Sequence, residues 1–247
     1  MNGTLKRLHQ KRFFQDFGYL ILKGAFADDI DWISDEFERV YRERGIVPDG
    51  EIRAGCGGMI ESSEKLVTML DCKEFVDALT AILGPDYNYL GSAGEIYTGD
   101  GMFHPDGQYP LGRHVKVALY LEHLTAESGA LRIIAGSNHG RWDGNQDTWG
   151  QWGISPEEVP CVAPEHIPGD VVLFDLNTVH TSLNGSTRRR MLNMGFVAHA
   201  ETEEELAWLR RSIGRPPYSE LMLRVASPQL RSHLQQVVEL GTAPGVS

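Results

Sequence analysis

Residues 168–197 read PGDVVLFDLNTVHTSLNGSTRRRMLNMGFV, and this stretch decides the predicted fold. A Pro-Gly-Asp turn leads into an apolar run at 170–174, and a second apolar run follows at 191–197. Short apolar or alternating runs separated by turn residues are typical of β-strands. Further runs of this kind lie upstream, at 87–90, 95–97, 115–121 and 130–134. This many short strands at such spacing predict a closed β-sandwich or barrel over about 86–198.

Helical patterns flank this β region on both sides, with apolar residues at helical spacing between capping and stop signals. The predicted helices cover 5–17, 28–45, 71–83, 202–213 and 227–241. A chain of 247 residues is long enough for one domain with a proper core. We therefore expect a single domain over 1–247, mainly β with flanking helices.

Local signals refine the helix ends and one loop. Asp71 with Glu74, and Thr202 with Glu205, have the spacing of capping boxes at helix N-termini. The glycine-rich segment 55–58 predicts an irregular loop that could approach a ligand.

Composition limits the classes of partner. The formal net charge of −11 counts against nucleic acid or an anionic membrane surface, because both select basic proteins. No stretch approaches the ~20 apolar residues of a membrane span. Cys56, Cys72 and Cys161 are odd in number and match no zinc pattern, so reduced thiols in a cytoplasmic protein are expected.

Three residues form a candidate metal site. In an extended segment, residues two apart point to one side, so His104 and Asp106 would present an imidazole and a carboxylate together. Such a pair alone is weak evidence. An antiparallel core can bring His180 beside it, and two imidazoles with one carboxylate form the ligand set of non-haem Fe(II) oxygenases.

An arginine triplet, Arg188, Arg189 and Arg190, follows His180 where the next strand begins. A guanidinium meets a carboxylate through two parallel hydrogen bonds, as a dicarboxylate co-substrate would need. Three consecutive side chains cannot all point inward, so at least one is solvated.

Several motifs together resemble the phytanoyl-CoA dioxygenase family of Fe(II)- and 2-oxoglutarate-dependent oxygenases, from about residue 13 to 197. The matching motifs are GYLILKG (18–24), FHPD (103–106), YLEHLTAESGALRIIAGSNH (120–139), PGDVVLFD (168–175) and HTSLNGSTRRRML (180–192). The 120–139 block is the most specific, although Ala135 stands where the family usually has proline. The resemblance implies a double-stranded β-helix, a cupin-like jelly roll.

The resemblance also implies roles. His104, Asp106 and His180 match the Fe(II) ligands, and one arginine of the triplet matches the residue that binds the distal carboxylate of 2-oxoglutarate. Arg189 is favoured because it lies seven residues before a phenylalanine, as in the family pattern; Arg190 remains an alternative. Ser182 matches a position that assists that carboxylate.

Weaker candidates surround this site. Tyr97 could hydrogen-bond the co-substrate or pack in the core. Lys116 interrupts an apolar strand, either as an outward residue or as a pocket cation. Gln108 and His114 flank the metal loop and are candidates for substrate contact. Trp142, in the long segment 135–168, could belong to a lid or to a packed loop.

The expected activity uses Fe(II), 2-oxoglutarate and O2 to hydroxylate or otherwise oxidise a small molecule, releasing succinate and CO2. Halogenating relatives lack a carboxylate at the position of Asp106, so its presence favours hydroxylation, desaturation or ring closure. The alternatives are a cupin-like metal-binding isomerase or binding protein without oxygenase activity, and an iron-free interaction domain. A monomer and a homodimer are both compatible with the sequence.

Overall fold

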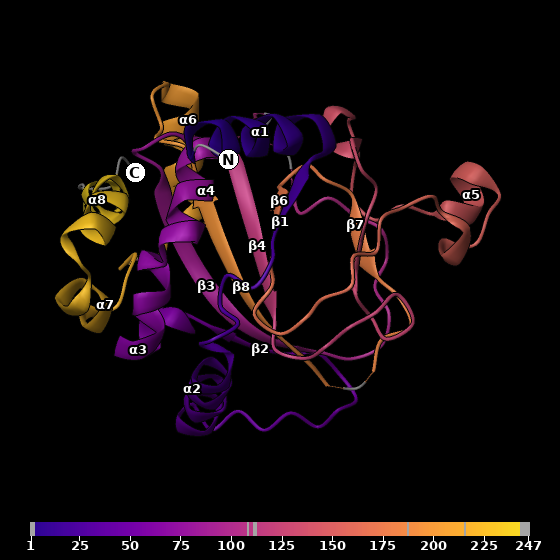
Figure 1. Ribbon diagram of the computed structural model, residues 1–247, viewed down its shortest axis with the longest axis horizontal. Coiled ribbons are helices and arrows are strands. Elements are labelled where there is room, and N and C mark those ends of the chain that lie inside the picture. Colours follow the sequence, from indigo (N-terminus) through magenta and orange to yellow (C-terminus); the bar gives the residue numbers. More distant parts are fainter. Residues whose placement is uncertain (1–2, 108, 111–112, 187, 215, 243–247) are drawn as a thin grey trace.

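The computed structural model describes residues 3–107, 109–110, 113–186, 188–214 and 216–242 (Figure 1). Its strands are β1 (Tyr19–Leu22), β2 (Ala54–Gly57), β3 (Asn88–Tyr97), β4 (His114–Tyr120), β5 (Leu131–Ile133), β6 (Val171–Asp175), β7 (His180–Ser182) and β8 (Arg189–Val197). Its α-helices are α1 (Gly3–Phe17), α2 (Ile30–Glu43), α3 (Glu64–Val67), α4 (Lys73–Leu83), α5 (Thr148–Trp152), α6 (Glu203–Ser212), α7 (Glu220–Val225) and α8 (Pro228–Thr242). Short 3-10 turns occupy Ile60–Ser62, Thr68–Asp71, Ser137–His139 and Pro156–Glu158.

A six-stranded antiparallel sheet in the order β1-β6-β4-β8-β3-β2 forms one wall of the molecule. Strand β8 lies between β4 and β3 and is paired along its whole length. Apart from β2 and β3, strands that are consecutive in the sequence are not neighbours in this sheet, so the chain crosses between layers repeatedly, which is the pattern of a jelly roll.

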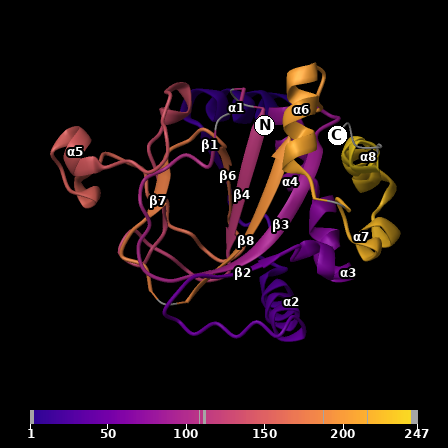
Figure 2. The same cartoon turned by 180° about the vertical axis from the view of Figure 1, so that it is seen from behind.

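The opposite wall is smaller and less regular. Strands β5 and β7 pair with each other, and single bridges add His104 beside His180 and Val162 beside Ile133. The predicted β-sandwich is therefore confirmed, although its large sheet also includes β1 and β2 from outside 86–198. The backbone bridge between His104 and His180 joins the segment that carries His104 to the smaller wall. In Figures 1 and 2 this smaller wall lies beside β4 and β6, on the side away from most of the helices.

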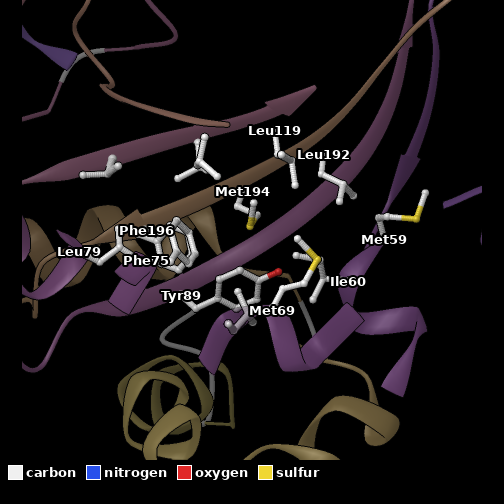
Figure 3. Close-up of a cluster of buried hydrophobic side chains, with 14 of the residues drawn as sticks. Met59, Ile60, Met69, Phe75, Leu79, Tyr89, Leu119, Leu192, Met194 and Phe196 are labelled. Atoms are coloured by element: carbon white, nitrogen blue, oxygen red, sulfur yellow. The ribbon is translucent and has the colours of Figure 1, made fainter. Parts of the chain in front are cut away.

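Helices cover the outer face of the large sheet, and the main apolar core lies between this sheet and the helices. Phe75 of α4 meets Phe196 of β8 edge to face, with ring centroids 5.5 Å apart. Figure 3 shows Leu192, Met194 and Phe196 on the side of β8 that faces this layer. The period of two along a strand thus sends these three residues outward and leaves their neighbours facing the interior of the barrel.

The expected flanking helices are confirmed, but two local expectations are wrong and one helix was not expected. Helix α4 has Cys72 as its N-cap residue, with no side-chain cap, because the Asp71 carboxylate accepts a hydrogen bond from Ser227 instead. The Thr202–Glu205 capping box is present. Residues 55–58 were expected in a loop, yet most of this segment is the edge strand β2. Helix α7 was not expected.

The first helix is also placed differently from what its sequence suggests. Its long apolar residues remain partly in solvent, with Leu8 61% exposed, whereas Phe14 is fully buried. Separately, no helix in the described part of the chain is long and apolar enough to cross a bilayer.

Candidate functional site

A cavity of about 390 Å³ opens between the two walls of the barrel. We call it the central cavity. It is lined by the inner-facing residues of β3, β4 and β8, by the loop 98–106 and by β7. Among its lining residues are all three candidate metal ligands, together with Tyr97, Lys116, Ser182 and Arg189.

Backbone hydrogen bonds between distant segments hold the three candidate ligands together. His104 and His180 exchange both of their backbone hydrogen bonds, each 3.0 Å long, and the Asp106 N–H donates to Leu176 O at 3.1 Å. As a result, one donor atom from each of the three side chains lies within 4.8 Å of the others. The sequence separation of His180 from the pair is therefore closed by strand pairing.

Both imidazoles are oriented by their second nitrogen. His104 Nδ1 lies 2.7 Å from Met102 O, and His180 Nδ1 lies 2.9 Å from Thr178 O. A carbonyl can only accept, so each Nδ1 carries the proton and each Nε2 keeps a lone pair. Both Nε2 atoms lie 3.9 Å from an Asp106 carboxylate oxygen. This is how metal-ligating histidines are held in place by their surroundings.

Electrostatics favours the protonation states that metal binding needs. Burial lowers the pKa of His180, against the opposing pull of Asp106, so the imidazole is neutral at pH 7. Burial raises the pKa of Asp106, but His180, Lys116 and His104 outweigh it and bring the pKa below its ordinary value. Neutral imidazoles with a charged carboxylate are the donor set for a divalent cation.

Arg189 lies at the deep end of the central cavity and is only 2% exposed. Its Nη1 donates to Gly129 O at 3.0 Å and to Ser182 Oγ, and its Nη2 donates to Gly99 O. Its Nε is buried without a hydrogen-bond partner among the described residues. Asp100 lines the same cavity, but its Oδ1 accepts a hydrogen bond from the Gly185 N–H. A buried guanidinium that forms no ion pair among the described residues, and that has one donor unused, is suited to receiving an anionic ligand.

Two glycines shape the space around this guanidinium. Gly129 has a φ of +95°, where other residues are strained, and a Cβ there would clash with Arg189 Nη1 and Cδ. A Cβ on Gly185 would clash with Arg189 Cζ. These positions must lack side chains for the Arg189 side chain to keep this conformation.

The neighbouring Arg190 points to the other side of the sheet. Its Nε donates to Glu122 at 2.5 Å and its Nη1 donates to Glu38 at 2.7 Å, and it does not line the central cavity. Arg188 also bonds Glu38. The alternative that Arg190 binds the co-substrate therefore does not fit its position, because its guanidinium is already paired with two carboxylates.

Tyr97 and Lys116 both face the central cavity. Tyr97 pairs with Arg189 across β3 and β8, and Arg53 Cζ lies 4.7 Å from its ring centroid. Burial raises the pKa of Tyr97 to about 12, so it stays a neutral phenol. Lys116 Nζ lies 3.6 Å from Asp106 Oδ2, so the residue is a cavity cation and not an outward-facing one.

Three weaker candidates lie elsewhere. His114 is buried between the rings of Tyr109 and Trp208, outside the central cavity. Trp142 donates its indole N–H to Ser137 O and packs near Phe103, while α5 projects from the body in Figures 1 and 2, so neither closes over the candidate ligands. Gln108 lies outside the described residues.

Some cavity residues were not singled out from the sequence. Arg53 precedes the unexpected strand β2, so nothing pointed to it. Asn193 also lines the cavity; the alternation along 189–196 places it on the same face as Arg189, although it was not named as a site residue. Thr181, next to His180, has a buried hydroxyl without a partner among the described residues.

The fold is shared with solved structures of low sequence identity. The non-haem alpha-ketoglutarate-dependent carbocyclase SnoK from nogalamycin biosynthesis matches with a TM-score of 0.62 and 17% identity, over 77% of this chain and 83% of that one. The epimerase SnoN, in complex with Fe3+, alpha-ketoglutarate and nogalamycin RO, matches with a TM-score of 0.63 and 14% identity, over 79% of this chain and 84% of that one.

EctD from S. alaskensis, with 2-oxoglutarate and 5-hydroxyectoine, matches with a TM-score of 0.61 and 18% identity, over 77% of this chain and 75% of that one. These matches identify the fold as the expected double-stranded β-helix. No curated protein sequence is similar enough to this chain to count as a match. The family model for phytanoyl-CoA dioxygenase (PhyH) matches residues 14–192. The chain therefore belongs to the phytanoyl-CoA dioxygenase family.

Proposed function

We propose that this protein is an Fe(II)- and 2-oxoglutarate-dependent oxygenase that hydroxylates, or otherwise oxidises, a small-molecule metabolite or natural-product intermediate. One observation carries the proposal. A single cavity contains two oriented imidazoles, a carboxylate and a buried guanidinium with no carboxylate partner of its own. Family membership supports the same reading, and we further propose that the whole chain acts as one catalytic domain.

His104, Asp106 and His180 would hold the iron. Two imidazoles and one carboxylate on one side of the ion leave positions for further ligands. The hydrogen bonds from Nδ1 to backbone carbonyls fix the rings, so little reorganisation is needed on binding. When bound, iron and 2-oxoglutarate supply the oxidising chemistry, in which O2 is consumed, 2-oxoglutarate becomes succinate and CO2, and a C–H bond of the substrate is oxidised.

Arg189 would bind the distal carboxylate of 2-oxoglutarate. Ser182 Oγ accepts a hydrogen bond from Arg189 Nη1 and donates one to Gly129 O, so it holds the guanidinium in one orientation. Tyr97 and Tyr120 line the cavity on the part of the sheet that carries Arg189, whose side chain is only 2% exposed. A dry setting strengthens the charged contact.

The proposal covers several types of oxidation of the substrate. SnoK is described as a carbocyclase, SnoN as an epimerase, and EctD was solved with a hydroxylated compound. One fold therefore accommodates several outcomes of C–H cleavage. The alternative of a cupin-like isomerase or binding protein without oxygenase activity has no use for the unpaired Arg189, and for this reason we favour the oxygenase.

The test is anaerobic addition of Fe(II) and 2-oxoglutarate to the metal-free protein, followed by absorption spectroscopy. We expect a visible metal-to-ligand charge-transfer band that His104→Ala removes and Arg190→Met keeps. On admission of air, succinate should form slowly even without a primary substrate. Absence of the band in the wild-type protein, or an unchanged band in His104→Ala, would refute the proposal.

A further inference from the structure

The inner face of the large sheet continues past the candidate metal ligands into a second depression of about 410 Å³, which we call the outer groove. It shares Asp106, Lys116 and Asn193 with the central cavity. Helix α6 supplies its far wall through Trp208. A molecule in the outer groove would therefore have one end next to Asp106. The inference developed from this groove rests on the proposed function.

Strand register places Lys116 and Arg189 at opposite ends of this continuous surface. Lys116 is the direct neighbour of Gly195 on β8, six residues beyond Arg189. At ~3.3 Å per residue, their backbones are separated by roughly 20 Å along the sheet. Asp106 contacts Lys116, so the candidate metal site lies between the two cations. Arg189 lies in the central cavity, and Lys116 lies where the central cavity meets the outer groove.

Charge makes Lys116 the recognition group of the outer groove. Its near partner is Asp106 Oδ2, at 3.6 Å, and the charge of this carboxylate is shared with a dication once metal is bound. Arg53, by contrast, is fully occupied by a two-point ion pair with Glu95, at 2.8 and 2.7 Å. Burial lowers the pKa of His114 to about 3, so it is neutral. Among the described lining residues of the groove, Lys116 is thus the only cation.

The shape of the groove complements this charge. Gly91, Ala93 and Gly195 make its floor and contribute no long side chain, while Leu90 and His114 lie beside Gly195. Asn193 pairs with Ala93 and Ala118 on the neighbouring strands and presents an amide at the boundary of the two cavities. One ammonium and one amide match a singly charged carboxylate, whereas a phosphate dianion would need a second cation.

We propose that the outer groove binds the primary substrate as a small carboxylic acid, whose carboxylate is held by Lys116 Nζ and the Asn193 amide. The remainder of the molecule lies along the glycine floor towards Trp208. Lys116 is then a specificity-determining residue that places the substrate beside the metal, while Arg189 separately holds 2-oxoglutarate.

The test uses the anaerobic Fe(II)·2-oxoglutarate complex and follows its charge-transfer band. The probes are phenylacetate, cyclohexanecarboxylate and indole-3-acetate, each compared with its primary amide. We expect at least one acid to perturb the band. The corresponding amide should bind at least about tenfold more weakly, as for the loss of one charge-assisted hydrogen bond. Lys116→Gln should weaken binding of the acid by a similar factor, and Lys116→Arg should retain most of the binding.

Two controls separate the explanations. The exposed Lys73 loses the same charge in Lys73→Gln without touching either cavity, and acid binding should not change. The dissociation constant of 2-oxoglutarate should stay within about twofold in Lys116→Gln, because the Lys116 ammonium lies beside Asp106 and not beside Arg189.

Three outcomes would overturn the inference while leaving the oxygenase proposal intact: no acid perturbs the band, amides act as strongly as acids, or Lys116→Gln weakens 2-oxoglutarate itself. The last would assign Lys116 to the co-substrate. If the wild-type protein forms no band at all, the oxygenase proposal fails first, and the inference that rests on it fails with it.

Discussion

The two faces of the large sheet differ in what their side chains do. Along β8, Leu192, Met194 and Phe196 face the helices and are buried in a continuous apolar core. On the other face of the same strand, Arg189 and Asn193 line the cavities. One face is packed to exclude water and fill space, and the other keeps polar groups around an open volume.

This difference separates stability from function within a single strand. The outer face gains free energy from apolar burial. The inner face carries groups that cost free energy to bury, such as Arg189 Nε, which has no hydrogen-bond partner among the described residues. Such a cost is retained where a ligand supplies the missing partner. Outer-face substitutions should therefore change stability, and inner-face substitutions should change ligand binding.

The largest effect is expected from removing a candidate metal ligand. His104→Ala should reduce succinate formation from 2-oxoglutarate to background, because the two remaining ligands, Asp106 and His180, hold iron poorly. The His104 side chain is 37% exposed, so the unfolding temperature of the metal-free protein should change little. Metal should stabilise the wild-type protein in thermal unfolding and fail to stabilise the variant. Full activity in His104→Ala would break the comparison.

On the outer face, Phe196→Ala should lower the free energy of unfolding by about 3–5 kcal/mol, because the ring is 2% exposed and contacts Phe75 and Tyr89. Denaturant titration measures this loss. Under conditions where the variant remains folded, its affinity for 2-oxoglutarate should match wild type. A variant with normal stability and weakened co-substrate binding would contradict the separation of the two faces.

Adjacent arginines allow the sharpest test. Arg189→Met should weaken the binding of 2-oxoglutarate by at least about tenfold, since a charge-assisted hydrogen bond is lost. Arg190→Met should leave that affinity unchanged but cost about 2 kcal/mol of stability, because Glu38 and Glu122 lose their shared partner. Spectroscopic titration and denaturant unfolding measure the two effects. An exchange of the two phenotypes would mean that the faces are reversed.

The smallest effect concerns pH. Burial lowers the pKa of His114 to about 3 and that of His166 to about 4. Both histidines take up protons near pH 6.5 when unfolded, so the unfolded state binds more protons between that pH and the folded values. Stability should therefore fall as pH drops below about 6.5, by up to ~1.4 kcal/mol per pH unit for each histidine.

The measurement is the free energy of unfolding between pH 7 and 5, for wild type and for His114→Gln combined with His166→Gln. The double variant should show a shallower dependence. Equal slopes would show that these two side chains are not buried as neutral groups.

Periodicity predicted much of the architecture. The short runs became strands of a sandwich, and the buried stripe of α2, at Ile33, Phe37, Val40 and Tyr41, is the one that helical spacing implies. Errors arose where tertiary contacts replace local ones. Asp71 has the spacing of a cap, yet Ser227 from a distant helix takes its carboxylate. The apolar residues of α1 predicted a helix but not that most of them would stay partly exposed.

The candidate site divides in the same way. The sequence by itself determined its chemical constituents, because His104 and Asp106 share a side through the two-residue period of extended chain, and the family motifs indicate His180 and one arginine of 188–190. Only the tertiary structure decided which arginine faces the cavity, that Lys116 lies 3.6 Å from Asp106, that His114 lines the outer groove, and that Trp142 does not line the central cavity. The physical reason is that spacing defines a face, whereas the pairing of strands far apart in sequence defines what that face meets.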